Sequence, residues 1–378
     1  MAFRSKSKPL AVATAVGMLV TVAFSAGSTS PATAAVKKSD IVLVAAVINT
    51  TNPYMASNIA GAKALGKKLG IPVQIVDSQG SSQVQNSKIK AVLAQGKTVV
   101  LFVNTVSSSD APIIVNAVKK AKGFVTIWWN KPDGFEPAAQ GNHFVAFQKH
   151  PGVSSGECNA DQLGTALGGK GNVILFPGVK DSTTSATRVA GFRARLAAKF
   201  PNIKILEERP SNWDPNLANT NAKDLIVKYG DKINGVWAAD DAMQTGAMKA
   251  FEDAGLLNKT KFASDGLYED TIASIKSGRG NNAIVGETFH RGYMASAIGL
   301  YTAYLAATGK IDPSKLPVEK RHSLFKIACV SPSNMDEYTK YDGNIGGWID
   351  TLIKNGPWKT QPVPLVGAGP EVLPAVTN

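Results

Sequence analysis

The feature that most constrains the fold is a regular alternation of short β-branched runs with amphipathic stretches. Such short, nearly continuous apolar runs are typical of strands in parallel sheets that are covered on both faces. The stretches between them repeat apolar residues at helical spacing, as Ile59, Ala62 and Leu65 do. The alternation predicts α/β units with right-handed crossovers. The predicted strands lie at 41–48, 73–76, 99–103, 125–129, 173–176, 204–207 and 235–239.

The alternation occurs twice, over residues 40–130 and 170–290, with a connection at 131–152 that contains Pro and Gly. A chain of 378 residues is long enough for two domains. We therefore predict an α/β fold with two similar doubly wound parallel sheets. A long helix is expected at 291–307 and a strand at 324–330. The segment from 343 to 378 contains five prolines and is expected to be a loose or wrapping tail.

Residues 1–34 have the organisation of a signal peptide. Arg4, Lys6 and Lys8 precede an apolar run, and Ala32-Thr33-Ala34 suits a signal peptidase. The apolar run is interrupted by small and polar residues, which makes it short for crossing a bilayer core of roughly 30 Å. We therefore expect export to the periplasm, the cell envelope or the exterior. No cysteine lies near the cut, so no lipid anchor is expected.

Composition argues against several classes of function. Two cysteines and four scattered histidines cannot supply a four-ligand zinc site, and neither a metal nor another cofactor is expected. The formal net charge is +13, and three of its positive charges fall in the predicted signal peptide. The remaining lysines are scattered along the chain, which favours a solvated surface over nucleic-acid binding.

Two enzyme-like motifs fit their context poorly. Gly152-Val153-Ser154-Ser155-Gly156 matches the nucleophile elbow of hydrolases, but no strand is expected to run directly into its serine. The stretch from Gly164 to Lys170 resembles a phosphate-binding loop, but Gly171 replaces the required Ser or Thr. We therefore expect a protein that is not an enzyme, with a secreted hydrolase as the weaker alternative.

Polar and aromatic residues follow nearly every predicted strand. Ligands of open parallel sheets bind beyond the carboxyl ends of the strands, so these side chains are expected to line a cleft between two sheets. Planar donors and acceptors suit vicinal hydroxyls, and an aromatic ring suits the apolar face of a sugar. Each residue alone could be a helix cap or a turn residue, but their recurrence favours a sugar-binding site. The strand-end residues are 49–55, 128–131, 180–184, Arg188, 213–214, 240–241, 265–266 and Glu287.

At these positions the chain resembles periplasmic sugar-binding proteins of the ribose-binding type, the type I solute receptors of ABC importers. The resemblance implies two lobes joined by three crossovers, which close on a carbohydrate or polyol and deliver it to the membrane subunits of a permease. It spans roughly residues 40–334. Its motifs are Thr51-Asn52-Pro53-Tyr54, Asp77-Ser78-Gln79, Asn104, 188–192, 239–243 and Ser264-Asp265-Gly266.

The resemblance also implies particular positions and boundaries. Residues 36–150 and 288–327 would form lobe 1, and residues 151–287 and 328–345 would form lobe 2, with a Pro-rich C-terminal tail at 346–378. Cys158 begins the second lobe and Cys329 lies in a strand that returns to it, so we expect a disulfide after export. The implied ligand positions are Asn52, Tyr54, Met55, Trp129, Asn130, Arg188, Trp213, Asp240, Asp265 and Glu287.

The chain departs from the family pattern at several of these positions. Trp129-Asn130 replaces an Asp-Arg pair that grips sugar hydroxyls, while Asp240 and Glu287 replace a common Asn and Gln. These departures argue against simple ribose and leave an amino sugar, a polyol or another cationic solute open.

Two further questions remain open at this point. Strand alternation allows either Trp129 or Trp128 to face the cleft, and we predict that Trp129 does. A chemosensory or autoinducer receptor of the same fold is the alternative to transport.

Overall fold

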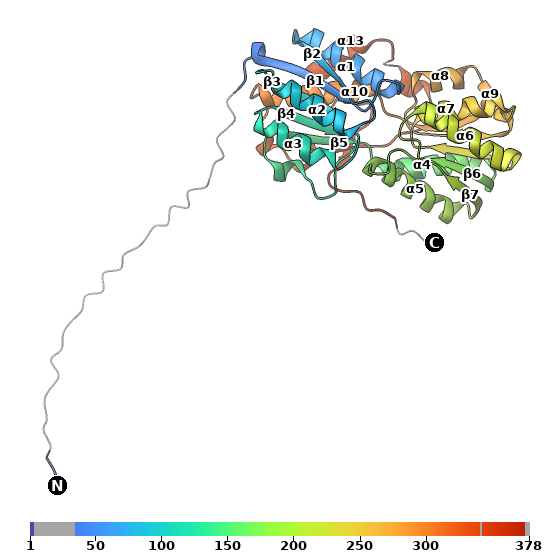
Figure 1. Cartoon of the computed structure of the whole chain (residues 1–378), viewed down its shortest axis with the longest axis horizontal. Coiled ribbons are helices and arrows are strands. Elements are labelled where there is room, and N and C mark those ends of the chain that lie inside the picture. The colour runs from blue at the N-terminus through green and yellow to red at the C-terminus, as the bar shows by residue number, and fades with distance from the viewer. Residues whose placement is uncertain (4–34, 341, 375–378) are drawn as a thin grey trace. The chain divides into compact units, whose positions relative to one another are not determined.

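The computed structural model describes residues 1–3, 35–340 and 342–374. Residues 4–34, which make up most of the predicted signal peptide, lie outside the described residues. From residue 35 onward, helices and strands alternate along two sheets (Figure 1). Within the described ranges, we find no helix that is both long and apolar enough to cross a membrane.

Lobe 1 is built on a seven-stranded sheet in the order β13-β11-β5-β4-β3-β1-β2. All neighbouring strands are parallel except β13, which pairs antiparallel with β11. The strands are β1 (Ile41–Val47), β2 (Val73–Asp77), β3 (Thr98–Asn104), β4 (Phe124–Trp128), β5 (Phe144–Lys149), β11 (His322–Phe325) and β13 (Leu365–Gly367). The helices are α1 (Pro53–Leu69), α2 (Ser82–Leu93), α3 (Asp110–Lys120), α10 (Gly292–Ala307), α11 (Val318–Arg321) and α13 (Ile345–Asn355).

Lobe 2 is built on a six-stranded sheet in the order β12-β10-β9-β8-β6-β7. It is parallel except for β12, which runs antiparallel to β10. The strands are β6 (Lys170–Phe176), β7 (Asn202–Glu208), β8 (Gly235–Ala238), β9 (Lys261–Ala263), β10 (Ile284–Thr288) and β12 (Cys329–Val330). The helices are α4 (Gly152–Ala166), α5 (Thr183–Lys199), α6 (Pro215–Tyr229), α7 (Asp241–Asp253), α8 (Glu269–Lys276) and α9 (Arg279–Asn282), and α12 (Asp336–Thr339) follows β12. The two sheets confirm the predicted fold class.

Local sequence explains where the site-bearing helices begin. The side chain of Asn52 accepts a hydrogen bond from the backbone N–H of Tyr54, and Pro53 occupies the first helical position of α1. Asp214 and Asp240 cap α6 and α7 in the same way. Each cap lies just after a strand, so the helix starts and the strand ends meet at one edge of each sheet. That edge faces the other lobe.

Three chain crossings connect the lobes, at residues 150–151, 289–291 and 326–328. The last crossing divides the predicted strand at 324–330 into β11 of lobe 1 and β12 of lobe 2. The predicted connection at 131–152 contains β5, a fully buried strand that its Pro- and Gly-containing flanks concealed.

The Pro-rich segment after residue 345 wraps around lobe 1. In α13, Trp348, Ile349 and Leu352 are buried, and this helix contacts α1 and α10. Strand β13 then pairs with β11 at the edge of the sheet, where prolines on its flanks interrupt no central ladder. Of the two sequence-based alternatives, the structure therefore has the wrapping segment.

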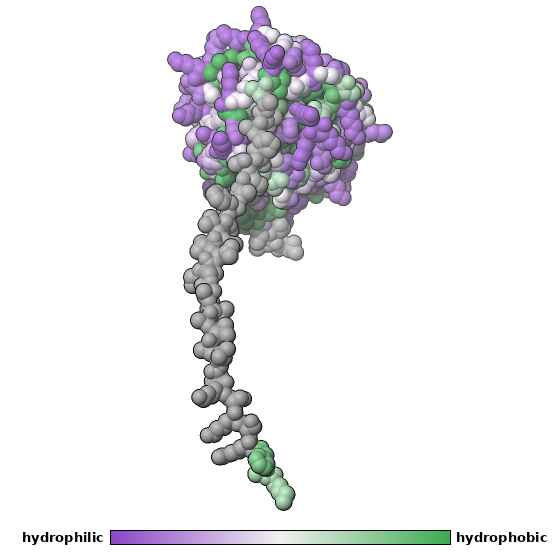
Figure 2. Space-filling model, turned by 90° about the vertical axis from the view of Figure 1, so that its left-hand side faces the viewer, coloured by the Kyte–Doolittle hydropathy of each residue, from purple (hydrophilic) through white to green (hydrophobic). Residues whose placement is uncertain are grey.

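The surface of lobe 1 is mainly hydrophilic, and the two cysteines are paired, as expected for an exported protein. Figure 2 views the molecule from the lobe 1 end and shows hydrophilic residues over most of that face. Cys158 in α4 and Cys329 in β12 are joined by a disulfide, with their Cα atoms 5.9 Å apart. The bond ties the first helix of lobe 2 to its edge strand.

Candidate ligand-binding cleft

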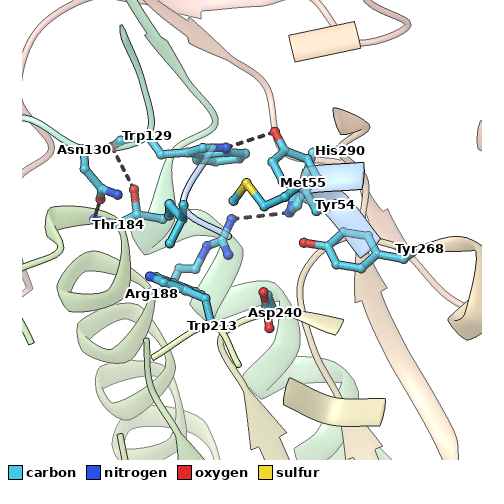
Figure 3. A pocket seen from close by; sticks show the side chains of 11 residues that line it. Tyr54, Met55, Trp129, Asn130, Thr184, Arg188, Trp213, Asp240, Tyr268 and His290 are labelled. Atoms are coloured by element: carbon cyan, nitrogen blue, oxygen red, sulfur yellow. Dashed lines mark hydrogen bonds between the residues drawn. The ribbon is translucent and has the colours of Figure 1, made fainter. Parts of the chain in front are cut away.

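A small pocket lies where the carboxyl ends of both sheets meet (Figure 3). The space enclosed between the side chains of the pocket is about 30 Å³. Lobe 1, lobe 2 and the second crossing all contribute side chains. The lining residues are Ile48, Tyr54, Met55, Trp129 and Asn130 of lobe 1, Thr184, Arg188, Trp213, Asp240 and Tyr268 of lobe 2, and His290 of the crossing.

Most of the predicted ligand positions meet at this pocket. The structure brings Tyr54, Met55, Trp129, Asn130, Arg188, Trp213 and Asp240 to its lining, and it adds Ile48, Thr184, Tyr268 and His290. Asn52, Asp265 and Glu287 do not line the pocket. These three residues lie behind the lining, where each contacts different neighbours.

Trp129 faces the pocket, while Trp128 is buried in the core of lobe 1. Trp128 stacks on Phe325 and donates from its indole N–H to Gln148. The indole N–H of Trp129 donates to the Tyr54 hydroxyl at 2.9 Å (Figure 3). The chain turns sharply at Trp129, directly after β4.

Both pocket tryptophans have an unusual backbone conformation. The φ angle is +75° at Trp129 and +62° at Trp213, in the left-handed region that bulky residues rarely adopt. Such conformations cost on the order of 1–3 kcal/mol each and persist where the surroundings impose them. At Trp129 the surroundings include Thr184 of the other lobe, whose hydroxyl donates to the Trp129 carbonyl at 2.7 Å. Strain at two rings of one pocket points to a ligand site.

Arg188 supplies the cation of the pocket. Its guanidinium carbon lies 5.0 Å from the centre of the Trp129 ring, and Nη1 donates to the carbonyl of Ala239. Its Nε lies 3.8 Å from Asp265 Oδ2. Cation–π contact and charge pairing hold this buried side chain in place. The guanidinium is thus fixed between the two lobes.

His290 is neutral and offers a donor. Arg188 Nη2 lies 3.4 Å from His290 Nε2, and since arginine can only donate, Nε2 accepts and the ring proton is on Nδ1. Burial first, and then the positive charge of Arg188, lower the pKa of His290 well below its usual value. Nδ1 is buried and has no hydrogen-bond partner among the described residues.

Asp240 joins the two lobes and has a perturbed acidity. Oδ2 accepts from the side-chain amide of Asn52 at 2.7 Å, and Oδ1 accepts from the Met243 N–H at 2.9 Å. The Asn52 amide also donates to the carbonyl of Trp213 at 3.1 Å. Burial raises the pKa of Asp240 to about 7, although these hydrogen bonds and Arg188 oppose the rise. The carboxyl therefore titrates near neutral pH.

Asp265 lies behind the pocket lining and pairs with Arg188. It is fully buried and accepts hydrogen bonds from Ser155, from Thr288 at 2.5 Å and from Asn159 at 3.1 Å. Burial raises the pKa of Asp265 to about 6. The nucleophile position of the serine motif is Ser154, which is exposed within α4, while its neighbour Ser155 bonds to Asp265. The strand preceding α4 ends at Lys149. The motif therefore lacks the strand-to-serine turn of a hydrolase elbow.

Glu287 does not reach the pocket. Its carboxylate accepts from Gln244 at 2.8 Å and from Ser264 at 3.0 Å, at the end of β10. Burial and the neighbouring Asp241 raise the pKa of Glu287 well above its usual value. This residue supports the start of α7, and thus Asp240, because its place in the β10 ladder directs it to that helix.

The lobes touch around the pocket, so the structure has a closed arrangement. Tyr54 of lobe 1 stacks on Tyr268 of lobe 2, with ring centres 5.6 Å apart. The side-chain oxygen of Asn130 accepts from the Ser182 hydroxyl at 2.8 Å and from the Thr184 N–H at 3.1 Å. These contacts and the Asn52–Asp240 bond join the lobes on different sides of the pocket.

Comparisons with known proteins agree with this architecture. A family model described as periplasmic binding protein domain matches residues 41–310. The xylitol-binding protein of Mycolicibacterium smegmatis is 26% identical over 317 residues, covering 83% of this chain and 84% of that protein. The ribose import binding protein of Haemophilus influenzae is 22% identical over 274 residues, covering 72% and 88%. A crystal structure of a twin-arginine translocation pathway signal protein from Burkholderia phytofirmans matches with a TM-score of 0.77 and 29% identity, covering 86% of this chain and 98% of that one.

Proposed function

The chain belongs to the periplasmic binding protein family, and we propose that it is the exported solute receptor of an ABC importer. It binds one small polyhydroxylated solute between its lobes and delivers it to the permease. The observation that carries the proposal is the closed pocket at the carboxyl ends of both sheets, with aromatic rings on both walls and the charged groups of Arg188 and Asp240 on the lobe 2 wall. Its role is binding rather than catalysis, since the hydrolase-like serine motif is part of α4.

A neutral polyol such as xylitol is the solute class that the pocket supports best. Arg188 is a fixed cation, His290 is held neutral, and Asp240 is partly protonated near neutral pH. The pocket therefore has little negative charge to offer, which disfavours the amino sugars and other cationic solutes that the sequence left open. The similarity to a xylitol-binding protein supports the same choice.

The lining residues have different roles in binding the solute. Arg188, Asn130 and Asp240 hydrogen-bond hydroxyl groups, and charged partners strengthen such bonds. The free Nδ1–H of His290 adds a donor. The rings of Trp129 and Trp213 pack against C–H groups of the solute. Asn52 and Asp265 hold Asp240 and Arg188 in position.

Mass spectrometry of the protein as purified tests the proposal directly. We expect a bound neutral polyol or sugar, and we expect xylitol to raise the melting temperature through preferential binding to the folded state. Ribose, galactose and glucosamine are the comparison solutes. An anionic or amino-bearing solute, or catalysed breakdown of the bound compound, would contradict the proposal. Uptake of the same solute by cells that lack the protein separates transport from the less favoured sensory role.

A further inference from the structure

The C-terminal segment, residues 363–374, connects the two lobes beside the first crossing. It is attached to lobe 1 through the β13–β11 pairing and through the Lys326 N–H, which donates to the Pro364 carbonyl at 2.8 Å. Beyond β13, Glu371 reaches the start of α4 in lobe 2. Figure 1 shows the chain leaving the seven-stranded sheet at the junction of the two lobes.

The carboxylate of Glu371 contacts the chain on both sides of the crossing at residues 150–151. Oε1 of Glu371 accepts a hydrogen bond from the Val153 N–H in the first turn of α4 at 2.8 Å. Oε2 forms an ion pair with Lys149, the last residue of β5. Both charged side chains are only 7% exposed. The contact therefore spans from lobe 1 to lobe 2 across the chain segment that must bend when the lobes separate.

The start of α4 needs this carboxylate. Its N-cap residue is Pro151, which has no side-chain group to accept from the first-turn N–H groups, and no acidic residue lies in that turn. Unsatisfied N–H groups and the positive end of a helix dipole both favour an anion. Glu371 supplies one from 218 positions further along the chain.

Both lobes also contact the segment around Glu371. A crevice beside it is lined by Gly369, Pro370 and Leu373 of the segment, by Lys131 and Phe147 of lobe 1, and by Thr183 and Thr187 of lobe 2. Because β13 fixes the segment to lobe 1, rotation of lobe 2 away from lobe 1 would draw α4 away from Glu371. We therefore expect the contact to be complete only in the closed geometry of the crossing.

We propose that Glu371 restrains the hinge and shifts the protein toward its closed arrangement. The C-terminal segment thereby sets the fraction of open molecules, and through it the affinity for the solute and the ease of release. This inference goes beyond the proposed function and does not depend on which solute binds. It assigns a conformational role to a segment outside residues 41–310, the part that matches the family model.

Distance measurements between the lobes, made on the full chain after any co-purified solute has been removed, test the inference. Spin labels are placed at the exposed positions Ile113 in lobe 1 and Val227 in lobe 2, and pulsed dipolar spectroscopy reports the distances between them. We expect Glu371→Ala to increase the ratio of open to closed molecules about tenfold, whereas Glu371→Gln, which keeps an acceptor for Val153, has a smaller effect. Val372→Ala is the matched control, since Val372 is 89% exposed and adjacent.

Hydrogen exchange at the Val153 amide completes the test. Faster exchange at Val153 together with longer label distances in Glu371→Ala supports the hinge role. Faster exchange with unchanged distances means that Glu371 only caps α4, and this result overturns the proposal. If Glu371→Ala does not fold, Lys149→Met removes the partner instead. Unchanged distances in that variant likewise count against a restraint. Because no solute is present, neither result bears on the proposed ligand.

Discussion

The two walls of the pocket are chemically different. Both lobes contribute aromatic rings, but the charged groups of the lining, Arg188 and Asp240, come from lobe 2 alone, whereas lobe 1 adds the apolar side chains of Ile48 and Met55. Buried carboxyls lie behind the charged groups of lobe 2, and strained turns position Trp129 of lobe 1 and Trp213 of lobe 2. We therefore expect lobe 2 to supply most of the binding energy and its pH dependence, and lobe 1 to select the shape of the solute.

The largest expected effect concerns the stability of lobe 2, which contains both cysteines. Opening a cross-link between residues 171 positions apart should lower the stability by about 3–5 kcal/mol on the chain-entropy model. Hydrogen exchange with and without reductant checks this. We expect faster exchange in α4 and β12 and little change in α2 and α3 of lobe 1. Two thiols titrating in the unfolded, unreduced protein would show that no disulfide forms.

Arg188→Ala should produce the largest loss of binding. Removing the guanidinium takes away a hydrogen-bond donor to the hydroxyl groups of the solute and leaves Asp265 buried without its counter-charge. Together these losses should cost about 2–4 kcal/mol in affinity for xylitol. Arg193→Ala is the matched control on the same helix, because Arg193 is 40% exposed and pairs with Glu208 at the surface. Calorimetry of both folded variants provides the comparison. Equal affinities would assign the binding energy to lobe 1 instead.

Trp129→Ala tests the other wall. Losing the ring should weaken xylitol binding at least tenfold, or roughly 1.4 kcal/mol, with a smaller effect on stability. Trp128→Ala should do the reverse, because Trp128 is fully buried and its truncation leaves a cavity that costs about 3–5 kcal/mol of stability. Titration calorimetry and thermal melts separate the two variants. The opposite pattern would contradict the assignment of Trp129 to the pocket.

The smallest expected effect is a pH dependence that belongs to Asp240. An ionised carboxylate accepts stronger hydrogen bonds from hydroxyls, so the affinity for xylitol should rise several-fold between pH 6 and 8, around the pKa of about 7.

The stability of the folded protein should change in the opposite direction. Because the folded-state pKa is raised from 3.8, the folded protein holds this proton more tightly, and the contribution of Asp240 to stability is lost as pH rises from about 4 to 7. Asp240→Asn should flatten the affinity profile and reduce the pH dependence of stability, of which a part remains because the pKa values of Asp265 and Glu287 are also raised. A steep affinity profile that survives this substitution would assign the titration to another group.

Much of the cleft could be predicted because parallel strands bring their carboxyl ends to one edge. That rule, together with the family resemblance, predicts from the sequence that Tyr54, Trp129, Arg188 and Asp240 lie near one another. The direction of Trp129 could not be derived from strand alternation alone, since it also depends on the left-handed turn after β4.

Other parts of the site depend on contacts that sequence patterns do not encode. His290 lines the pocket because it lies in the second crossing, which passes behind the pocket. Tyr268 lines the pocket because it stacks on Tyr54 of the other lobe. Glu287 follows the family spacing, yet its place at the end of β10 directs it to Gln244. The apolar face of α13 was concealed by the prolines around it, so the wrapping of the C-terminal segment could not be distinguished from a loose tail.

Calorimetric titration of the wild-type protein with xylitol at pH 8 tests the central claim most directly, namely that the two walls together bind one neutral polyol. The account predicts saturable binding with one site per chain and a negative heat-capacity change, as expected when apolar surface on the tryptophans is buried. Absence of binding by xylitol, ribose and galactose, together with tight binding of glucosamine, would contradict it.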